Sequence, residues 1–239
     1  MTAPVPATEK ASLVEDFVDI IFSPAKVFAR RATGGVWGPL IVVSVVIAVL
    51  AFVNAGTMQG VMDAEINRAV AQATASNPNV TEEQLAPMRS MMEMSMKWGP
   101  VVIMPIVFCL LGLCIWLVGK MFGGVLGFGT GVMIAAYAYV PRVLEQMLVA
   151  IQALALDTST YTSRHQFSLG VGRFMDPNGP QGLLNTIGRI DLFTLWVTAL
   201  VVIGLIHAGK VAKDKAIIGG VILWVLGAAP FAMALLQGK

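Results

Sequence analysis

The chain has 239 residues, of which 56% are hydrophobic and only 13% are charged, whereas about 25% of the residues of a soluble domain are charged. The formal net charge of +2 is too small to indicate a nucleic acid as partner. Charged residues are missing in long blocks, which predicts an all-α, polytopic membrane protein with five transmembrane helices and an amphipathic N-terminal helix. Five spans would leave no room for a separate soluble domain.

The N-terminal part is predicted to hold a tail and an amphipathic segment. Residues 1–11 are polar and rich in Pro and Ala, which is typical of a disordered tail. Residues 12–36 are predicted to form two short helices in the membrane interface; the alternative is that these helices dock on the spans. The apolar stripe of the first helix consists of Leu13, Phe17, Ile20 and Ile21, and the acids opposite it are Glu15, Asp16 and Asp19. In the second helix, Val27 and Phe28 lie opposite Lys26, Arg30 and Arg31.

Residues 37–239 are predicted to form one five-span transmembrane domain. A helix needs about 20 apolar residues to cross the hydrocarbon, and five hydrophobic runs come near that length. The predicted spans cover residues 38–56, 99–118, 128–154, 192–208 and 216–236. The outer loop 57–97 is predicted to be helical. The outer loop 157–190 is predicted to be irregular, with a short helix near residues 183–189.

Orientation is predicted from the lysines and arginines of the connections. They are divided almost evenly between the two sides, so their number alone does not decide the topology. One side has the shorter, more basic connections. This favours a cytoplasmic N-terminus and a C-terminus outside.

The third predicted span carries Pro141, Arg142 and Glu145 near its middle. A charge at that depth costs a few kcal/mol by insertion scales, so each charge needs a partner. Arg142 and Glu145 are three residues apart and share one helical face. The functional hypothesis is that the pair forms a polar binding site for an ion or lipid headgroup, or a docking point for a transmembrane helix of a partner. Two alternatives stay open: the span ends near Pro141, or the pair only fixes helix packing.

Asp191 opens the fourth predicted span. An acid at that place stabilises a helix N-terminus. A second interpretation is an ion pair with Arg142 or Arg189 that joins the third and fourth spans. One carboxylate could do both.

Methionines cluster in the sequence MRSMMEMSM, at positions 88, 91, 92, 94 and 96. Thioether sulfur is a soft ligand that suits Cu(I). Met88, Met91 and Met92 also have the spacing of one helical face, which is typical of a pliable surface for packing or partner binding. With no His or Cys nearby in the sequence, the partner surface is favoured over copper.

Motifs of catalysis and cofactor binding are not found. The chain has no HExxH, no GxSxG and no P-loop. Cys109 and Cys114 are five residues apart on one predicted helix, too far for a disulfide, and they lack metal-ligand spacing. We therefore predict no enzyme activity, no cofactor and no metal site.

Several dispersed features resemble the YIP family (Ypt/Rab-interacting proteins) in its bacterial form. They are Pro24 and Phe28 in SPAKVF, Trp37 and Pro39, AYAYVP ending in Pro141, and Asp191, Phe193, Trp196 and Gly204 in IDLFTLWVTALVVIGL. The resemblance implies a five-span helical membrane protein with a cytoplasmic N-terminus. Eukaryotic members are associated with prenylated Rab GTPases. The very short N-terminal tail of this chain favours the bacterial branch and thus the bacterial inner membrane.

The resulting functional expectation is a non-enzymatic integral membrane scaffold or accessory protein that binds another membrane protein. The resemblance suggests an ABC-type export system as that partner. The alternative is a small transporter or channel that uses Arg142 and Glu145, with Asp191 along the same polar path. A lipid-binding role is motivated only by the amphipathic segment.

Overall fold

The computed structural model describes residues 11–77, 79, 81–157 and 160–236. All regular elements in these residues are helices, which confirms the predicted all-α class. The predicted disordered tail lies outside the described residues, except for Ala11.

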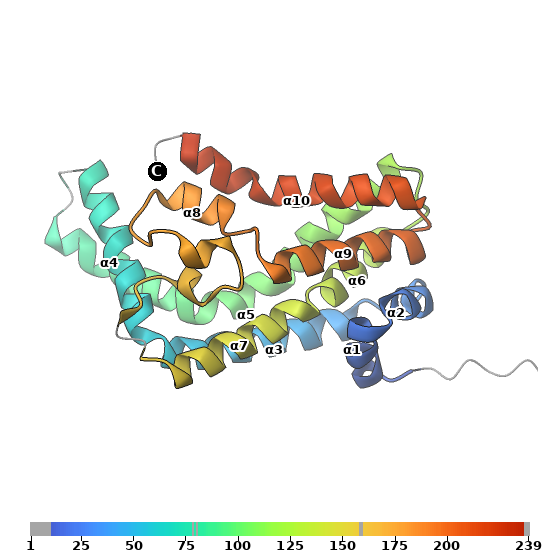
Figure 1. Cartoon of the computed structure of the whole chain (residues 1–239), viewed down its shortest axis with the longest axis horizontal. Coiled ribbons are helices and arrows are strands. Elements are labelled where there is room, and N and C mark those ends of the chain that lie inside the picture. The colour runs from blue at the N-terminus through green and yellow to red at the C-terminus, as the bar shows by residue number, and fades with distance from the viewer. Residues whose placement is uncertain (1–10, 78, 80, 158–159, 237–239) are drawn as a thin grey trace, which may run out of the picture.

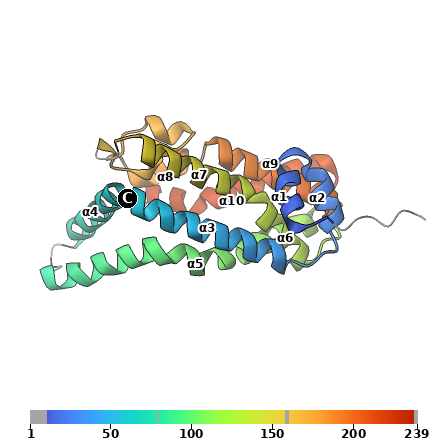
Figure 2. The ribbon, with the colours of Figure 1, turned by 90° about the horizontal axis from the view of Figure 1, so that it is seen from below.

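The long helices lie side by side along the longest axis of the molecule (Figures 1 and 2). Within the described residues, four segments are long and apolar enough to cross a membrane by length and composition, and one apolar helix of 16 residues is shorter. The four are α3 (Trp37–Thr57), α5 (Glu82–Met121), α6 with α7 (Phe128–Ala138 and Val140–Ala155) and α10 (Lys213–Leu236). The shorter one is α9 (Leu192–His207). The chain is therefore a polytopic membrane protein.

Helix α5 is longer than the sequence predicts. It runs for 40 residues without interruption and joins the second predicted span to the preceding loop helix. Pro87, Pro100 and Pro105 lie inside it. Each proline removes one backbone hydrogen bond, yet α5 stays helical past all three and packs along α3 and α6.

The third predicted span is not one helix, contrary to our expectation. Helix α6 ends at Ala138 and α7 begins at Val140, with Tyr139 between them. Pro141 has no N–H to donate to the carbonyl oxygen of Tyr137, so one helical hydrogen bond is missing at this place. The interruption therefore has a local cause in the sequence.

Helix α6 is the centre of the packed core. Every residue from Gly131 to Ala138 is buried. A Cβ atom on Gly131 would lie 2.3 Å from the carbonyl oxygen of Gly112, and one on Gly204 would lie 2.6 Å from Cγ2 of Ile134. Small residues thus allow α5 and α9 to approach α6 closely.

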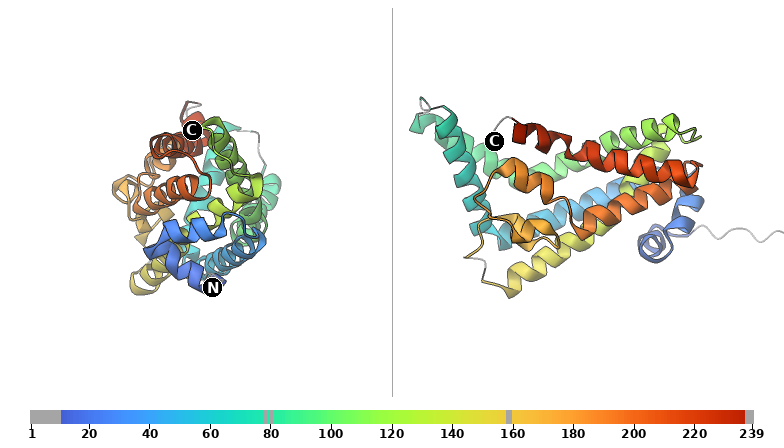
Figure 3. Two further views of the ribbon diagram at one scale, coloured as in Figure 1. Left: turned by 90° about the vertical axis from the view of Figure 1, so that its right-hand side faces the viewer. Right: turned by 45° about the horizontal axis from the view of Figure 1, so that its top comes forward.

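Short elements cover the two ends of the bundle (Figures 1 and 3). One end carries α1 (Leu13–Phe22) and α2 (Pro24–Arg31). The other carries α4 (Gln59–Ser76), α8 (Gln181–Ile187) and the 3-10 helices η2 (Arg164–Phe167) and η3 (Val171–Phe174). The described end of α10 lies at this second end (Figure 1).

The N-terminal helices pack on the bundle. Ile20, Val27 and Phe28 are fully buried in the same core cluster as Tyr137. Asp16 was expected on the solvent side of its helix, and this was wrong: its side chain is completely buried. The reason is a set of tertiary partners described below.

Candidate functional site

Arg142 of α7 is the centre of a polar network inside the bundle. Its Nη1 atom forms an ion pair with Oε2 of Glu145 and lies 3.7 Å from Oδ1 of Asp191. Its Nη2 atom donates to the hydroxyl of Thr194. The side chains of Arg142, Glu145 and Asp191 are only 28%, 17% and 5% exposed. The network therefore joins α7 to the first turn of α9 through partnered charges.

Asp191 has both of the roles that the sequence allows. Its Oδ1 atom accepts hydrogen bonds from the backbone N–H groups of Phe193 at 2.8 Å and Thr194 at 2.9 Å, which caps α9. Its Oδ2 atom accepts from the Thr194 hydroxyl. Gly170 lies against it, because a Cβ atom there would be 2.5 Å from Cβ of Asp191. The carboxylate thus connects α7 and α9, while the loop at Gly170 packs against the main chain and Cβ of the same residue.

Arg189 points elsewhere. Its Nη2 atom donates to the carbonyl oxygen of Trp224 in α10 at 3.2 Å. A Cβ atom on Gly227 would lie 2.6 Å from the same Nη2 atom, so this glycine makes room for the guanidinium. Of the two arginines that the sequence offered to Asp191, Arg142 is the one within ion-pair distance.

A cavity of about 580 Å³ opens beside this network. Arg142, Glu145 and Asp191 line it, together with three other charged residues, Glu65, Arg164 and Arg189. Asn54 and Gln146 line it as well, and the Asn54 amide donates to Oε1 of Gln146 at 2.8 Å. The arrangement could hold an ion or a polar headgroup, as the sequence-based hypothesis requires.

A second cavity, of about 450 Å³, lies between α4, α5 and η2. Met88, Met91 and Met92 all line it. Met91 is also 69% exposed, whereas Met88 and Met92 are half-buried. The predicted methionine stripe therefore lines this cavity, and Met91 is also exposed at the surface of the protein. We call this cavity the methionine groove.

The structure brings His165 of η2 to the methionine groove, which the sequence could not indicate. Its Nε2 atom lies 3.0 Å from Oδ1 of Asn185. Burial lowers the pKa of His165 below its ordinary value, and the nearby Arg164 guanidinium lowers it further, against the opposing effect of Asn185. The imidazole is therefore neutral at neutral pH.

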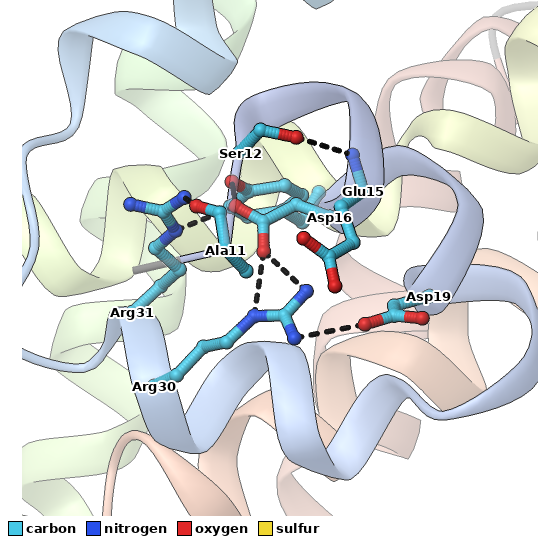
Figure 4. A network of polar contacts seen from close by, with 8 residues as sticks. Ala11, Ser12, Glu15, Asp16, Asp19, Arg30 and Arg31 are labelled. Atoms are coloured by element: carbon cyan, nitrogen blue, oxygen red, sulfur yellow. Dashed lines mark hydrogen bonds and ion pairs between the residues drawn. The ribbon is translucent and has the colours of Figure 1, made fainter. Parts of the chain in front are cut away.

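A further ionic cluster ties the N-terminal helices to the bundle (Figure 4). The buried carboxylate of Asp16 accepts from Nε of Arg30 at 2.7 Å, from Nε of Arg31 at 2.5 Å and from the Tyr137 hydroxyl at 2.7 Å. Arg30 also pairs with Asp19 at 2.8 Å. We call these five residues the N-terminal latch. The adjacent arginines in the next helix were the signal in the sequence that Asp16 has partners.

Comparison with known proteins gives one match. The Yip1 domain family model matches residues 18–234, from within α1 to near the end of α10. The matched range includes Arg142, Glu145, Asp191 and Tyr137, while Asp16 lies just before it. No curated protein and no solved structure matches the chain.

Proposed function

Because the chain belongs to the Yip1 domain family, we propose that it is a non-enzymatic scaffold or accessory protein that binds another membrane protein. The observation that carries this proposal is the exposed surface of α4 and the first half of α5, which extend from the end of the bundle (Figure 3). Met91, Met94 and Trp98 are 69%, 62% and 54% exposed there. Flexible thioethers and an aromatic ring suit an adaptable contact with a partner.

The proposal includes five crossings, with α9 as the shortest. The N-terminal helices and the described end of α10 lie at opposite ends of the bundle, which supports an odd number of crossings (Figure 1). The loops that follow α5 and α9 also meet, since the backbone N–H of Val125 donates to the carbonyl oxygen of Gly209 at 3.0 Å. Lys120, Lys210 and Lys213 lie beside these loops, and basic connections favour a cytoplasmic location. The N-terminus is then cytoplasmic, in a bacterial inner membrane.

An ABC-type export system is the first partner to test, a choice that rests on the family resemblance alone. A photoreactive amino acid at Met91 or Met94 should cross-link to one of its membrane subunits, co-expressed with the chain. The same label at Met121, which is 62% exposed on the opposite half of α5, is the control. Equal labelling at all three positions, or a protein that purifies alone from mild detergent without any adduct, would contradict the proposal.

The cavity beside Arg142 supports a second candidate, a small transporter or channel. A cavity of about 580 Å³ with Arg142 and Glu145 in its wall is suited to a charged solute. Proton or potassium flux into liposomes should then occur with the wild type and vanish in Glu145→Gln. Flux that is unchanged in this variant, or missing in the wild type, removes this candidate.

For the N-terminal segment we propose contact with the bilayer leaflet at the cytoplasmic end. The latch fixes one side of α1 on the bundle and leaves Val14, Val18 and Phe22 outward, 75%, 54% and 79% exposed. Their spacing of four residues forms one apolar face. The start of α1 lies against α3, because a Cβ on Gly38 would lie 3.1 Å from Cδ1 of Leu13.

A further inference from the structure

Methionines are concentrated around the two cavities. The two cavities share part of their walls, including Met96, Glu65 and His165. Half of the 14 methionines of the chain line one cavity or both. These seven are Met58, Met62, Met88, Met91, Met92, Met96 and Met104. Such a density of sulfur in two adjoining cavities calls for an explanation beyond ordinary core packing.

Three of these side chains are arranged along one face of α5. Met88, Met92 and Met96 follow at intervals of four residues, all are half-buried, and all line the methionine groove. Residues with this spacing have Cβ atoms about 5–6 Å apart. A methionine side chain has three rotatable bonds, so neighbouring sulfur atoms can converge on one point while the helix stays unchanged.

His165 supplies the nitrogen that was missing from the sequence pattern. It lies at the boundary of both cavities, as Met96 does. Its neutral form is the form that binds metals. Coordination through Nε2 would replace the contact of 3.0 Å with Asn185, whose amide also lines both cavities.

We propose that the methionine groove binds one soft monovalent metal ion, Cu(I) or its analogue Ag(I), through the sulfur atoms of Met92 and Met96 and the imidazole of His165. Met88 lies on the same helical face, so its sulfur could serve as a further ligand or replace one of the other two sulfur ligands. Soft thioether ligands select Cu(I), whereas Zn²⁺ is held by thiolate, imidazole and carboxylate groups. No group of three or more His, Cys, Asp or Glu side chains in the described residues could hold a metal. Selectivity for a soft ion follows from this ligand set.

The test is a titration of the purified full-length protein in detergent with Cu(I), under anaerobic reducing conditions, against a chromophoric Cu(I) chelator. One ion per chain is expected. The double variant Met92→Leu with Met96→Leu keeps the volume of the groove and should weaken binding by about tenfold or more. The matched control is Met94→Leu with Met121→Leu, two exposed methionines outside both cavities, which should bind as the wild type does.

A measurement on the wild type keeps the proposal falsifiable if the double variant does not fold. X-ray absorption of the Cu(I)-loaded protein should show both sulfur and nitrogen in the first coordination shell, and excess Zn²⁺ should not displace the ion. The proposal is overturned by a shell without sulfur, or by equal affinity in the double variant and its control. Partner cross-linking at Met91 needs no metal, so the failure of one proposal would leave the other standing.

Discussion

Oδ1 of Asp191 lies 3.7 Å from Nη1 of Arg142 and at the same time accepts the backbone N–H groups of Phe193 and Thr194, the second and third residues of α9. The carboxylate therefore stabilises the start of one helix while it neutralises a charge on another. The two contributions can be separated by substitution, because an asparagine side chain keeps the capping oxygen but loses the charge.

We expect Asp191→Ala to destabilise the protein more than Asp191→Asn does. Alanine removes the cap, which costs about 1 kcal/mol, and it also leaves Arg142 with fewer acceptors. Asparagine keeps the cap but removes the charge and the oxygen that accepts from the Thr194 hydroxyl. Thermal unfolding of the three proteins in the same detergent measures the difference. If the two variants unfold at the same temperature, the cap does not contribute to the stability of α9.

Glu145→Gln should destabilise the fold because it takes the nearest counter-charge from a mostly buried guanidinium. Removing one partner of a buried ion pair costs about 3 kcal/mol. Arg142→Gln also takes the guanidinium from the buried Asp191, so the double variant Arg142→Gln with Glu145→Gln should lose less stability than the sum of the losses in the two single variants. Additive losses in this pair of variants would show that Arg142 and Glu145 do not interact.

In the N-terminal latch, Asp16→Asn should release α1 and α2 from the bundle. The substitution leaves Arg30 and Arg31 without their fully buried acceptor, at an expected cost of about 3 kcal/mol. Tyr137→Phe loses one hydrogen bond to the same carboxylate and should cost about 1 kcal/mol. Protease cleavage between α2 and α3 measures the release, and it should be fastest in Asp16→Asn, slower in Tyr137→Phe and slowest in the wild type.

The control for the latch is Glu15→Gln. Glu15 is exposed on the same helix, and exposed substitutions usually change stability by less than about 0.5 kcal/mol. If Asp16→Asn is cleaved no faster than Glu15→Gln, the latch does not hold the N-terminal helices on the bundle.

Local features of the sequence predicted much of the fold. Long apolar runs predicted α3 and α10, and a carboxylate before an apolar run predicted the cap at Asp191. The pairing of Arg142 with Glu145 also followed from local spacing. In each case the partners lie within a few residues, or the bilayer itself dictates the pattern.

Contacts between distant parts of the chain could not be predicted in the same way. Asp16 was placed on the solvent side because helical periodicity ignores Tyr137, which follows far along the chain but donates to Asp16 at 2.7 Å. For the same reason the sequence did not predict that His165 and Met96 line the same cavities. The interruption at Tyr139 was different, because the sequence did contain a local signal for it, Pro141. We predicted one span over residues 128–154 nevertheless, because the apolar run there is long.

Spin labels should locate the outer face of α1 in the bilayer. With Cys109 and Cys114 replaced by alanine, a label at Val18 or Phe22 should be relaxed by oxygen dissolved in the lipid. A label at Glu15 should instead be relaxed by a water-soluble nickel complex. Equal accessibility to the nickel complex at all three positions would contradict the proposed contact with the leaflet.

Lipid charge should not change the depth of these labels. The acids and bases of residues 12–36 balance, three against three, and the latch already pairs four of them. These are Glu15, Asp16 and Asp19 against Lys26, Arg30 and Arg31. Burial of apolar surface then drives the contact. A label that moves deeper as anionic lipid is added would show that electrostatic attraction drives it instead.

Two glycines of α6 give the sharpest test of the helix packing. A Cβ atom on Gly131 would meet the carbonyl oxygen of Gly112 at 2.3 Å, whereas one on Gly129 would meet nothing within 4 Å. Gly131→Ala must therefore separate α5 from α6, and overpacking of this kind typically costs about 1–3 kcal/mol. Gly129→Ala makes the same chemical change in open space and should be neutral or stabilising by up to about 1 kcal/mol, because alanine favours the helix. The unfolding temperature should thus fall in Gly131→Ala. In Gly129→Ala it should stay the same or rise. Equal destabilisation by both would mean that α5 and α6 do not touch at these glycines.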